Sequence, residues 1–184
     1  ITTEQFAGTF EPIQRKMNYE EIQGSPYLDV ELIKGYVKFN LGDSSVQFLR
    51  YNIYTDEMEY LNGNKLFIIE NTGELDHVYI DGHYFYFKTY KYRNSFKKGY
   101  LEKMASGQYD LFIKHNVKYA KRQEAQSPYE QPIPDRFEGR EATWFCSFQN
   151  GPIKNIELDK TGLEAVFRDN YPLVRKYIKL NKLK

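Results

Sequence analysis

The sequence has one cysteine, a nearly balanced charge and no long apolar run, and each shortage excludes a class of protein. Cys146 has no partner within the chain, which excludes an internal disulfide and a cysteine-based zinc site. The 26 basic and 25 acidic residues leave a formal net charge of +1, so global charge gives no reason to expect a nucleic acid. No apolar stretch approaches the roughly 20 residues of a membrane-spanning helix. We therefore predict no nucleic-acid partner and no transmembrane segment.

Motifs for metal binding and phosphate binding are also missing. The sequence contains no HExxH, no G-x-x-x-x-G-K-[ST] and no G-x-G-x-x-G pattern. Of the three histidines, His77 and His83 flank an Asp-Gly turn that pairs Tyr79 with Tyr84. Alternation along each strand then places these two histidines on opposite faces of the hairpin. We predict no bound metal and no cofactor.

Two combinations of reactive side chains remain, and neither is favoured. Cys146 lies in the buried-looking strand "TWFCSFQ", where a thiol behaves as a small apolar group unless a base such as His115 is near. No G-x-S-x-G elbow is present. Glu57 and Glu59, close to Asp56, share one face of a predicted strand and could form an acid–base pair. Charges in this pattern are more often the solvated side of an edge strand, which we favour.

Aromatic residues are what the sequence has in quantity, with 17 Tyr and 13 Phe among 184 residues. Flat rings pack well on a pleated surface, so this content predicts strands. The tyrosines also explain how a mean hydropathy of −0.71 coexists with 41% hydrophobic residues. The length predicts a single domain over residues 1–184, with a core that needs no metal or disulfide.

Hairpin turn signals recur between runs rich in Tyr, Phe, Ile and Leu. The pairs Asn-Gly, Asp-Gly and Ser-Gly tolerate the positive φ values of two-residue turns, and they occur at residues 62–63, 81–82, 106–107 and 150–151. They predict ten strands, at residues 35–40, 46–54, 57–61, 65–70, 76–80, 83–90, 100–105, 108–122, 143–149 and 153–158. The fold class is therefore β-rich α+β, with an antiparallel meander over residues 35–158 that curls into a roll, a partly open barrel or a sandwich.

The two ends and one internal segment differ from this pattern. Residues 159–184 predict two short helices: Thr161 and Glu164 have capping-box spacing, and Pro172 permits a second start. Residues 1–34 are irregular. Residues 123–142 hold three of the seven prolines and predict a long loop. A loop of this length is often functional, but we favour a packed cover over a sheet edge.

The hairpin "VYIDGHYFYFKTYKY", residues 78–92, separates into two faces. Seven of its fifteen residues are Tyr or Phe. The turn at residues 81–82 puts an apolar set on the core face, namely Val78, Ile80, Phe85 and Phe87. The opposite face carries Tyr79, Tyr84 and Tyr86, with His77 and Lys88. These three tyrosines are the candidate binding residues, unless a second layer of structure buries them.

A basic run follows the hairpin and is interleaved with aromatic rings. Between residues 88 and 98 there are five cations and no acid: Lys88, Lys91, Arg93, Lys97 and Lys98. Together with Tyr90, Tyr92 and Phe96 they could hold an anionic, ring-bearing polymer. A solvated connection between two strands explains the run equally simply, and we favour it. Lys88, Lys91 and Arg93 stay on the list of candidate binding residues.

Three segments resemble a group of exported Bacteroidetes proteins of about 200 residues. They are "GSPYL" at residues 24–28, "LRYNIYTDEMEY" at residues 49–60 and the ending "FRDNYPLVRKYIKLNKLK". The resemblance implies no activity, cofactor or catalytic residue. It implies export to the periplasm or the cell surface after removal of a signal peptide. The chain begins with Ile1 rather than Met, so we expect either a removed signal segment or a trimmed chain.

The leading functional hypothesis is a non-enzymatic exported protein that binds or scaffolds an envelope protein or a glycan. The alternative is a hydrolase of an envelope polymer that uses two carboxylates for acid–base catalysis. A homo-oligomeric structural subunit is a third interpretation, because the sequence leaves the ligand and the oligomeric state open.

Overall fold

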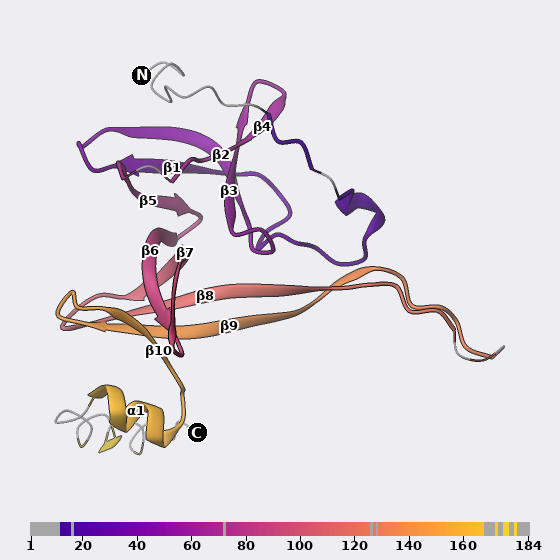
Figure 1. The fold of residues 1–184 in the computed structure, drawn as a ribbon. Coiled ribbons are helices and arrows are strands. Elements are labelled where there is room, and N and C mark those ends of the chain that lie inside the picture. Colours follow the sequence, from indigo (N-terminus) through magenta and orange to yellow (C-terminus); the bar gives the residue numbers. More distant parts are fainter. Residues whose placement is uncertain are drawn as a thin grey trace.

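The computed structural model describes residues 12–15, 17–71, 73–125, 127, 129–167, 172, 175–176 and 179, apart from the side chains at 140, 141 and 160 (Figure 1). Ten strands form one sheet in the order β10-β9-β8-β7-β6-β5-β1-β2-β3-β4. The strands are β1 (Ile33–Phe39), β2 (Ser44–Asn52), β3 (Glu57–Asn62), β4 (Lys65–Ile68), β5 (Leu75–Ile80), β6 (His83–Tyr92), β7 (Ser95–Ala105), β8 (Tyr109–Ala120), β9 (Arg136–Phe148) and β10 (Ile153–Ile156). The predicted β-rich antiparallel fold is confirmed.

The conformations of the turn residues determine where the hairpins form. Some turns lie one residue away from the predicted pair. Asp81 and Gly82 both have positive φ, 45° and 89°, as a type I′ turn requires. In the β3–β4 hairpin Asn62 still pairs with Lys65, so the turn begins at Gly63 instead. The β9–β10 turn is likewise centred on Gln149 and Asn150, which have φ of 46° and 58°.

Two meanders, β1–β4 and β5–β10, are joined side by side where β1 pairs with β5. At the far end β10 pairs with β6, Ile153 opposite Tyr90, and this is a parallel contact. It closes strands β6–β10 into a ring of five strands, called the barrel below. Strands β1–β5, with the first half of β6 and the part of β7 that pairs with it, curl more openly and are called the curled sheet.

Each region has its own core. The barrel encloses Tyr90, Leu101, Phe112 and Phe145, with Tyr92 and Ile153 packed against them. The curled sheet has the larger core. Residues of the N-terminal segment, the end of β8 and the start of β9 cover it. Its fully buried members are Val37, Leu49, Met58, Ile69, Val78, Phe85 and Tyr100, and its cover comes from Met17, Tyr19, Ile22, Leu28, Tyr119 and Phe137.

Strand β6 belongs to both regions, and its interior side changes along its length. Phe85 and Phe87 face the core of the curled sheet. Tyr90 and Tyr92, on the opposite side of the strand, face the barrel core. The side that carries Tyr84 and Tyr86 is therefore outside the curled sheet but continues into the barrel.

A partly buried ion pair connects the curled sheet to the barrel. Asp56, in the β2–β3 turn with φ of 60°, contacts the Lys114 ammonium of β8. Its carboxylate also accepts hydrogen bonds from the Tyr51 hydroxyl at 2.6 Å and the Tyr100 backbone N–H at 3.3 Å. Burial lowers the pKa of Lys114, and the carboxylate partly restores it. The carboxylate packs against Gly99, where a Cβ would lie only 2.1 Å from Asp56 Oδ2.

The predicted loop at residues 123–142 is too long, because a strand occupies its second part. β8 and β9 pair from Tyr109 opposite Phe148 to Ala120 opposite Arg136, so residues 136–142 belong to β9. Beyond them residues 121–125, 127 and 129–135 belong to a narrow arm, held by the bridge between Gln123 and Ile133, that projects from the body (Figure 1). Its described residues are largely exposed, so the arm covers no sheet edge.

The predictions for the two ends are partly tested. Helix α1 (Lys160–Phe167) is present, but the Asp159 carboxylate accepts the Gly162 N–H at 2.7 Å, so Asp159 rather than Thr161 provides the cap. Most of the second predicted helix lies outside the described residues, as do residues 1–11. Residues 17–32 are irregular apart from a short 3₁₀ turn, η2 (Tyr19–Glu21). No helix in the described part of the chain has the length and apolar character needed to cross a membrane.

Candidate binding surface

Five aromatic side chains meet on the outer side of the curled sheet, and we call them the aromatic face: Tyr36, His77, Tyr79, Tyr84 and Tyr86. Tyr79 pairs with Tyr36 of β1 on one side and with Tyr84 of β6 on the other, as the hairpin turn predicted for the second pair. The Tyr36 and Tyr79 rings stack with centroids 4.9 Å apart, and Tyr79 and Tyr84 are equally close. Three neighbouring strands therefore supply one continuous aromatic surface.

His77 completes the aromatic face toward the barrel. Its ring lies 5.5 Å from the Tyr84 ring and 5.3 Å from the Tyr86 ring, centroid to centroid. The Asp76 carboxylate lies 3.0 Å from His77 Nδ1 and fixes the ring orientation. The predicted separation of the histidines is confirmed, because His83 projects from the opposite face of β6 to reach Glu102.

The aromatic face is open to solvent in part. Tyr84 is 40% exposed, and the other four residues are half-buried against one another. Burial, followed by a hydrogen bond with Tyr84, raises the pKa of Tyr36, so the Tyr36 hydroxyl stays protonated at neutral pH. No second layer of described residues seals this surface.

Cations and a cleft border the aromatic face on its barrel side. The ammonium groups of Lys88 and Lys103 lie 5.8 and 5.7 Å from the centre of the Tyr86 ring. Lys103 is held at 2.9 Å by the Asp110 carboxylate. A cleft of about 330 Å³ opens here, lined by Tyr84, Tyr86, Lys103, Met104, Ala105 and Ser106. A ligand on the rings would therefore find positive charge and depth at one end.

The structure brings together four of the six predicted binding residues. Tyr79, Tyr84 and Tyr86 form the aromatic face, and Lys88 lies beside it. Lys91 lies on the opposite side of β6, and Arg93 lies in the β6–β7 turn, where its guanidinium covers the Tyr92 ring at 5.3 Å. These two do not join the aromatic face. Tyr36 and Lys103 do, but they come from other hairpins, and no local pattern in the sequence links them to residues 78–92.

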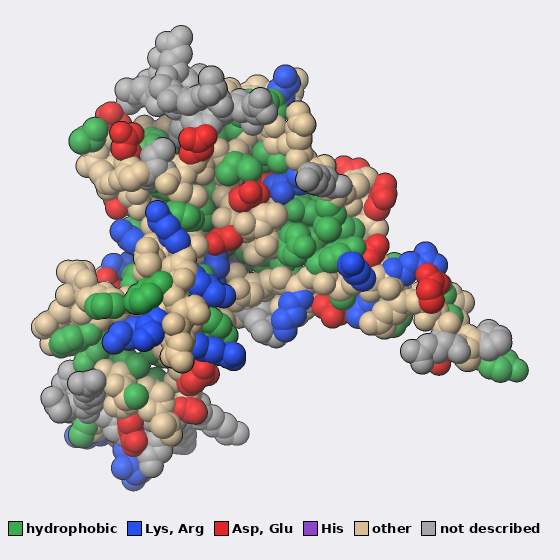
Figure 2. All heavy atoms as spheres, viewed as in Figure 1, with side chains coloured by type: hydrophobic (Ala, Val, Ile, Leu, Met, Phe, Trp, Pro, Cys, Tyr) green, Lys and Arg blue, Asp and Glu red, His purple; other side chains and the backbone are tan. Residues whose placement is uncertain are grey.

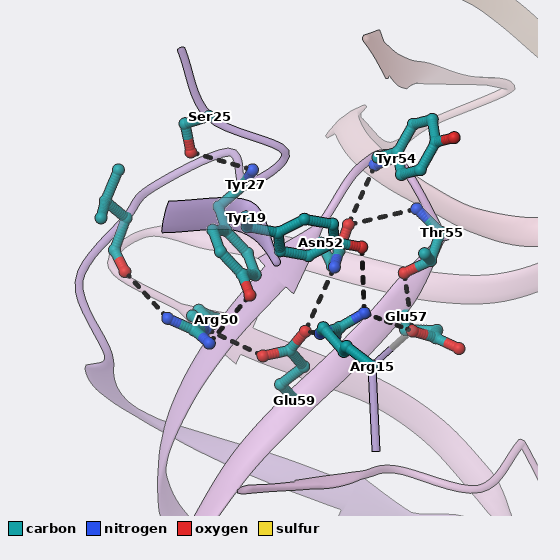
Figure 3. Close-up of polar contacts among 11 residues, drawn as sticks. Arg15, Tyr19, Ser25, Tyr27, Arg50, Asn52, Tyr54, Thr55, Glu57 and Glu59 are labelled. Carbon is teal, nitrogen blue, oxygen red and sulfur yellow. Dashed lines mark hydrogen bonds and ion pairs between the residues drawn. The ribbon is translucent and has the colours of Figure 1, made fainter. Parts of the chain in front are cut away.

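The carboxylate pair proposed from the sequence is not a solvated edge. β3 lies between β2 and β4, and Glu59 is completely buried (Figure 3). The Arg15 guanidinium contacts the Glu59 carboxylate, which also accepts from Arg50 Nε at 2.9 Å. Asn52 Nδ2 donates to it at 3.2 Å. The prediction of a solvated face for Glu59 is therefore wrong, because two guanidinium groups compensate its burial.

A cavity of about 460 Å³ opens beside this network and is lined in part by Arg15, Glu57, Tyr19, Tyr54 and Thr55. Glu57 lies 3.6 Å from Arg15, which also holds Glu59. The two carboxylates are thus joined by one guanidinium, and Glu59 lies behind Arg15 rather than on the cavity wall. The two carboxylates therefore do not line one open space in which a substrate could lie between them.

A second buried carboxylate, Glu102, lies between two histidines. Its oxygens are each 2.5 Å from a ring nitrogen, one of His83 and one of His115. Burial alone would raise the pKa of Glu102, but hydrogen bonds from His115 and His83 outweigh it and lower that pKa. Among the described residues, no group of three His, Cys, Asp or Glu side chains is arranged to hold a metal ion.

Cys146 is a buried core thiol, as predicted. It lies opposite Leu111 in the β8–β9 ladder, whereas His115 lies opposite Ala142 further along. Burial raises the pKa of the Cys146 thiol, which disfavours the reactive thiolate.

Comparison of the chain with protein-family models, curated proteins and solved structures finds no match in any of the three.

Proposed function

We propose that this is a non-enzymatic exported protein of the bacterial cell envelope that binds a glycan on its aromatic face. The observation that carries the proposal is the continuous contact of five aromatic rings across β1, β5 and β6 on a surface that remains partly open. Tyrosine offers a flat apolar ring and a hydroxyl that donates at its edge, which matches the alternating C–H and O–H groups of a sugar.

The rigidity of the site supports binding. The rings project from paired strands rather than from a loop, and each contacts at least one other ring. Such rings lose little conformational freedom when a ligand arrives, so more of the contact energy remains as affinity.

The location at the cell envelope is supported by the segments at residues 24–28, 49–60 and 167–184, which resemble exported proteins. Periplasmic and surface locations both present glycans. Either location is therefore consistent with the proposed ligand class.

The alternative, a carboxylate-based hydrolase, would use the cavity beside Glu57. It receives less support, because Arg15 contacts both carboxylates and only Glu57 of the two lines the cavity. Turnover of an envelope polymer that disappears in Glu57→Gln would favour this alternative over the binding protein.

The test is a glycan array followed by titration calorimetry with the best ligand. Removing the most exposed ring with Tyr84→Ala should weaken binding by roughly 5- to 30-fold, the effect of losing a hot spot of about 1–2 kcal/mol. Tyr129→Ala is the matched control, because Tyr129 is 98% exposed on the arm and outside the aromatic face. If Tyr84→Ala remains folded and binds the glycan as tightly as the control does, the aromatic face is not the site.

A further inference from the structure

A second surface, on the outer side of the barrel, concentrates positive charge around one exposed ring. Ile153 and Tyr90 pair across β10 and β6 and pack in the barrel core, so the next residues along these strands, Lys154 and Lys91, face outward. Lys91 in turn lies opposite Phe96 of β7. With Lys98, two positions further along β7, these residues form what we call the basic strip: Lys91, Phe96, Lys98 and Lys154.

The basic strip places like charges directly opposite each other. Lys154 pairs with Lys91 across a parallel ladder whose strands lie about 4.8 Å apart. Like charges in this position destabilise a sheet unless an anion lies between them. Within the described part of the chain, none of the three lysines forms an ion pair, and the Lys98 ammonium lies 5.2 Å from the centre of the Phe87 ring.

Phe96 gives the basic strip an apolar surface. It is 73% exposed, although Phe usually packs into a core. Figure 2 shows Lys and Arg side chains gathered over the β6–β7 hairpin with hydrophobic atoms among them. Arg93 and Lys97 add further charge at the end of this hairpin, and both lie near the Tyr92 ring.

We propose that the basic strip binds an acidic polysaccharide, with a sugar ring on Phe96 and its sulfate or carboxylate groups between the lysines. The basic strip has a single aromatic ring, and its side chains project from paired strands. Arg93 and Asn94, by contrast, lie in the hairpin turn. A bilayer surface would call for several apolar side chains that insert together, and a nucleic acid for a broader basic surface. The near-neutral net charge of +1 also argues for local rather than global attraction.

This inference is independent of the proposed function, because the basic strip and the aromatic face lie on opposite sides of β6. Tyr84→Ala should leave binding at the basic strip unchanged. Loss of one site with retention of the other therefore distinguishes the two proposals.

The test measures binding of the full chain to immobilised polymers over a series of salt concentrations. Heparin is the sulfated probe, polygalacturonate the carboxylated probe and dextran the neutral control. Lys91→Gln/Lys154→Gln should weaken binding to at least one acidic polymer roughly fivefold or more, and should lower the slope of log K against log salt by about two. Phe96→Ala should weaken binding without changing that slope.

The matched control is Lys65→Gln/Lys121→Gln, which removes the same charge from two exposed lysines outside the strip. Equal losses in both double variants would mean that only net charge matters, and would overturn the proposal. Tighter binding to single-stranded DNA or to anionic phospholipid vesicles than to both acidic polymers at the same salt would also overturn it. Thermal unfolding should show Lys91→Gln/Lys154→Gln to be at least as stable as the unmodified chain, because a repulsion is removed.

Discussion

The curled sheet and the barrel bury different kinds of side chain, although they share one continuous sheet. The barrel core is composed of aromatic and aliphatic groups. In the part of the chain that the structure describes, the buried charged side chains are Glu59, within the curled sheet, and Glu102 and Lys114, where the sheet meets the barrel. Hydrogen bonding between β10 and β6 closes the barrel. The curled sheet has no such closure, and polar contacts fix its N-terminal segment and its junction with the barrel. Charged side chains are thus buried where strand pairing alone does not fix how the segments of the chain pack together.

The largest expected effect is the loss of Glu59. Glu59→Ala leaves the Arg15 and Arg50 guanidinium groups without their shared buried partner, and should lower the free energy of unfolding by about 3–5 kcal/mol. Unfolding in urea, monitored by fluorescence, measures this free energy. Glu57→Ala, on the same strand but only partly buried, is the control and should cost less than about 1 kcal/mol. Equal effects would mean that Glu59 has no special role.

The corresponding change in the barrel removes a core side chain instead of a charge. Leu101 is completely buried, so Leu101→Ala should lower the free energy of unfolding by about 2–4 kcal/mol through lost burial and a cavity. Hydrogen exchange should show greater loss of protection in β10 than in β3. Uniform loss throughout the chain would instead indicate that barrel and curled sheet unfold as one unit. The exposed Leu158→Ala should change stability by no more than about 0.5 kcal/mol.

A smaller effect is expected at the junction between the two regions. A methyl group at residue 99 would collide with the Asp56 carboxylate and displace it from Lys114. Gly99→Ala should therefore cost about 1–3 kcal/mol. Gly107→Ala is the control, since a Cβ there meets only the Tyr109 carbonyl oxygen, at 3.9 Å. Unchanged urea midpoints for Gly99→Ala would contradict the close packing of Asp56.

The smallest expected effect is a pH dependence from Glu102. Its folded-state pKa lies below the ordinary value of 4.5, so the ionised group stabilises the fold above that pH. This contribution is lost as the pH falls through the folded-state pKa. Between pH 6 and pH 3, Glu102→Gln should therefore lose less stability than the unmodified chain does in urea titrations. Glu124→Gln, on the exposed arm, should retain the steeper dependence of the unmodified chain.

Local patterns predicted the strands well, and the predicted register of the β5–β6 hairpin is confirmed for the three pairs nearest its turn. A tight turn and the alternation of side chains determine such a hairpin within a few residues. The pairing of β1 with β5 and the closure of β10 on β6 were not predicted. Both join segments distant in sequence, and many strands of similar aromatic composition compete for each place.

The candidate surface was predicted only where it comes from a single hairpin. Tyr79, Tyr84 and Tyr86 follow from one hairpin, whereas Tyr36 arrives through the β1–β5 pairing. Glu59 was misplaced on a solvated face because its partner Arg15 comes from a distant, irregular segment. Alternation describes which side of a strand a residue occupies, but not which side the rest of the chain will cover.

Because β6 reverses its inner and outer sides between the curled sheet and the barrel, its length is constrained more strictly than its composition. A one-residue deletion near Lys88 would leave Phe85 in place but turn Tyr90 out of the barrel and Lys91 into it. The described residues of the arm carry no such requirement, since none of them belongs to a core. Sequence drift by insertion and deletion should therefore accumulate in the arm and spare β6.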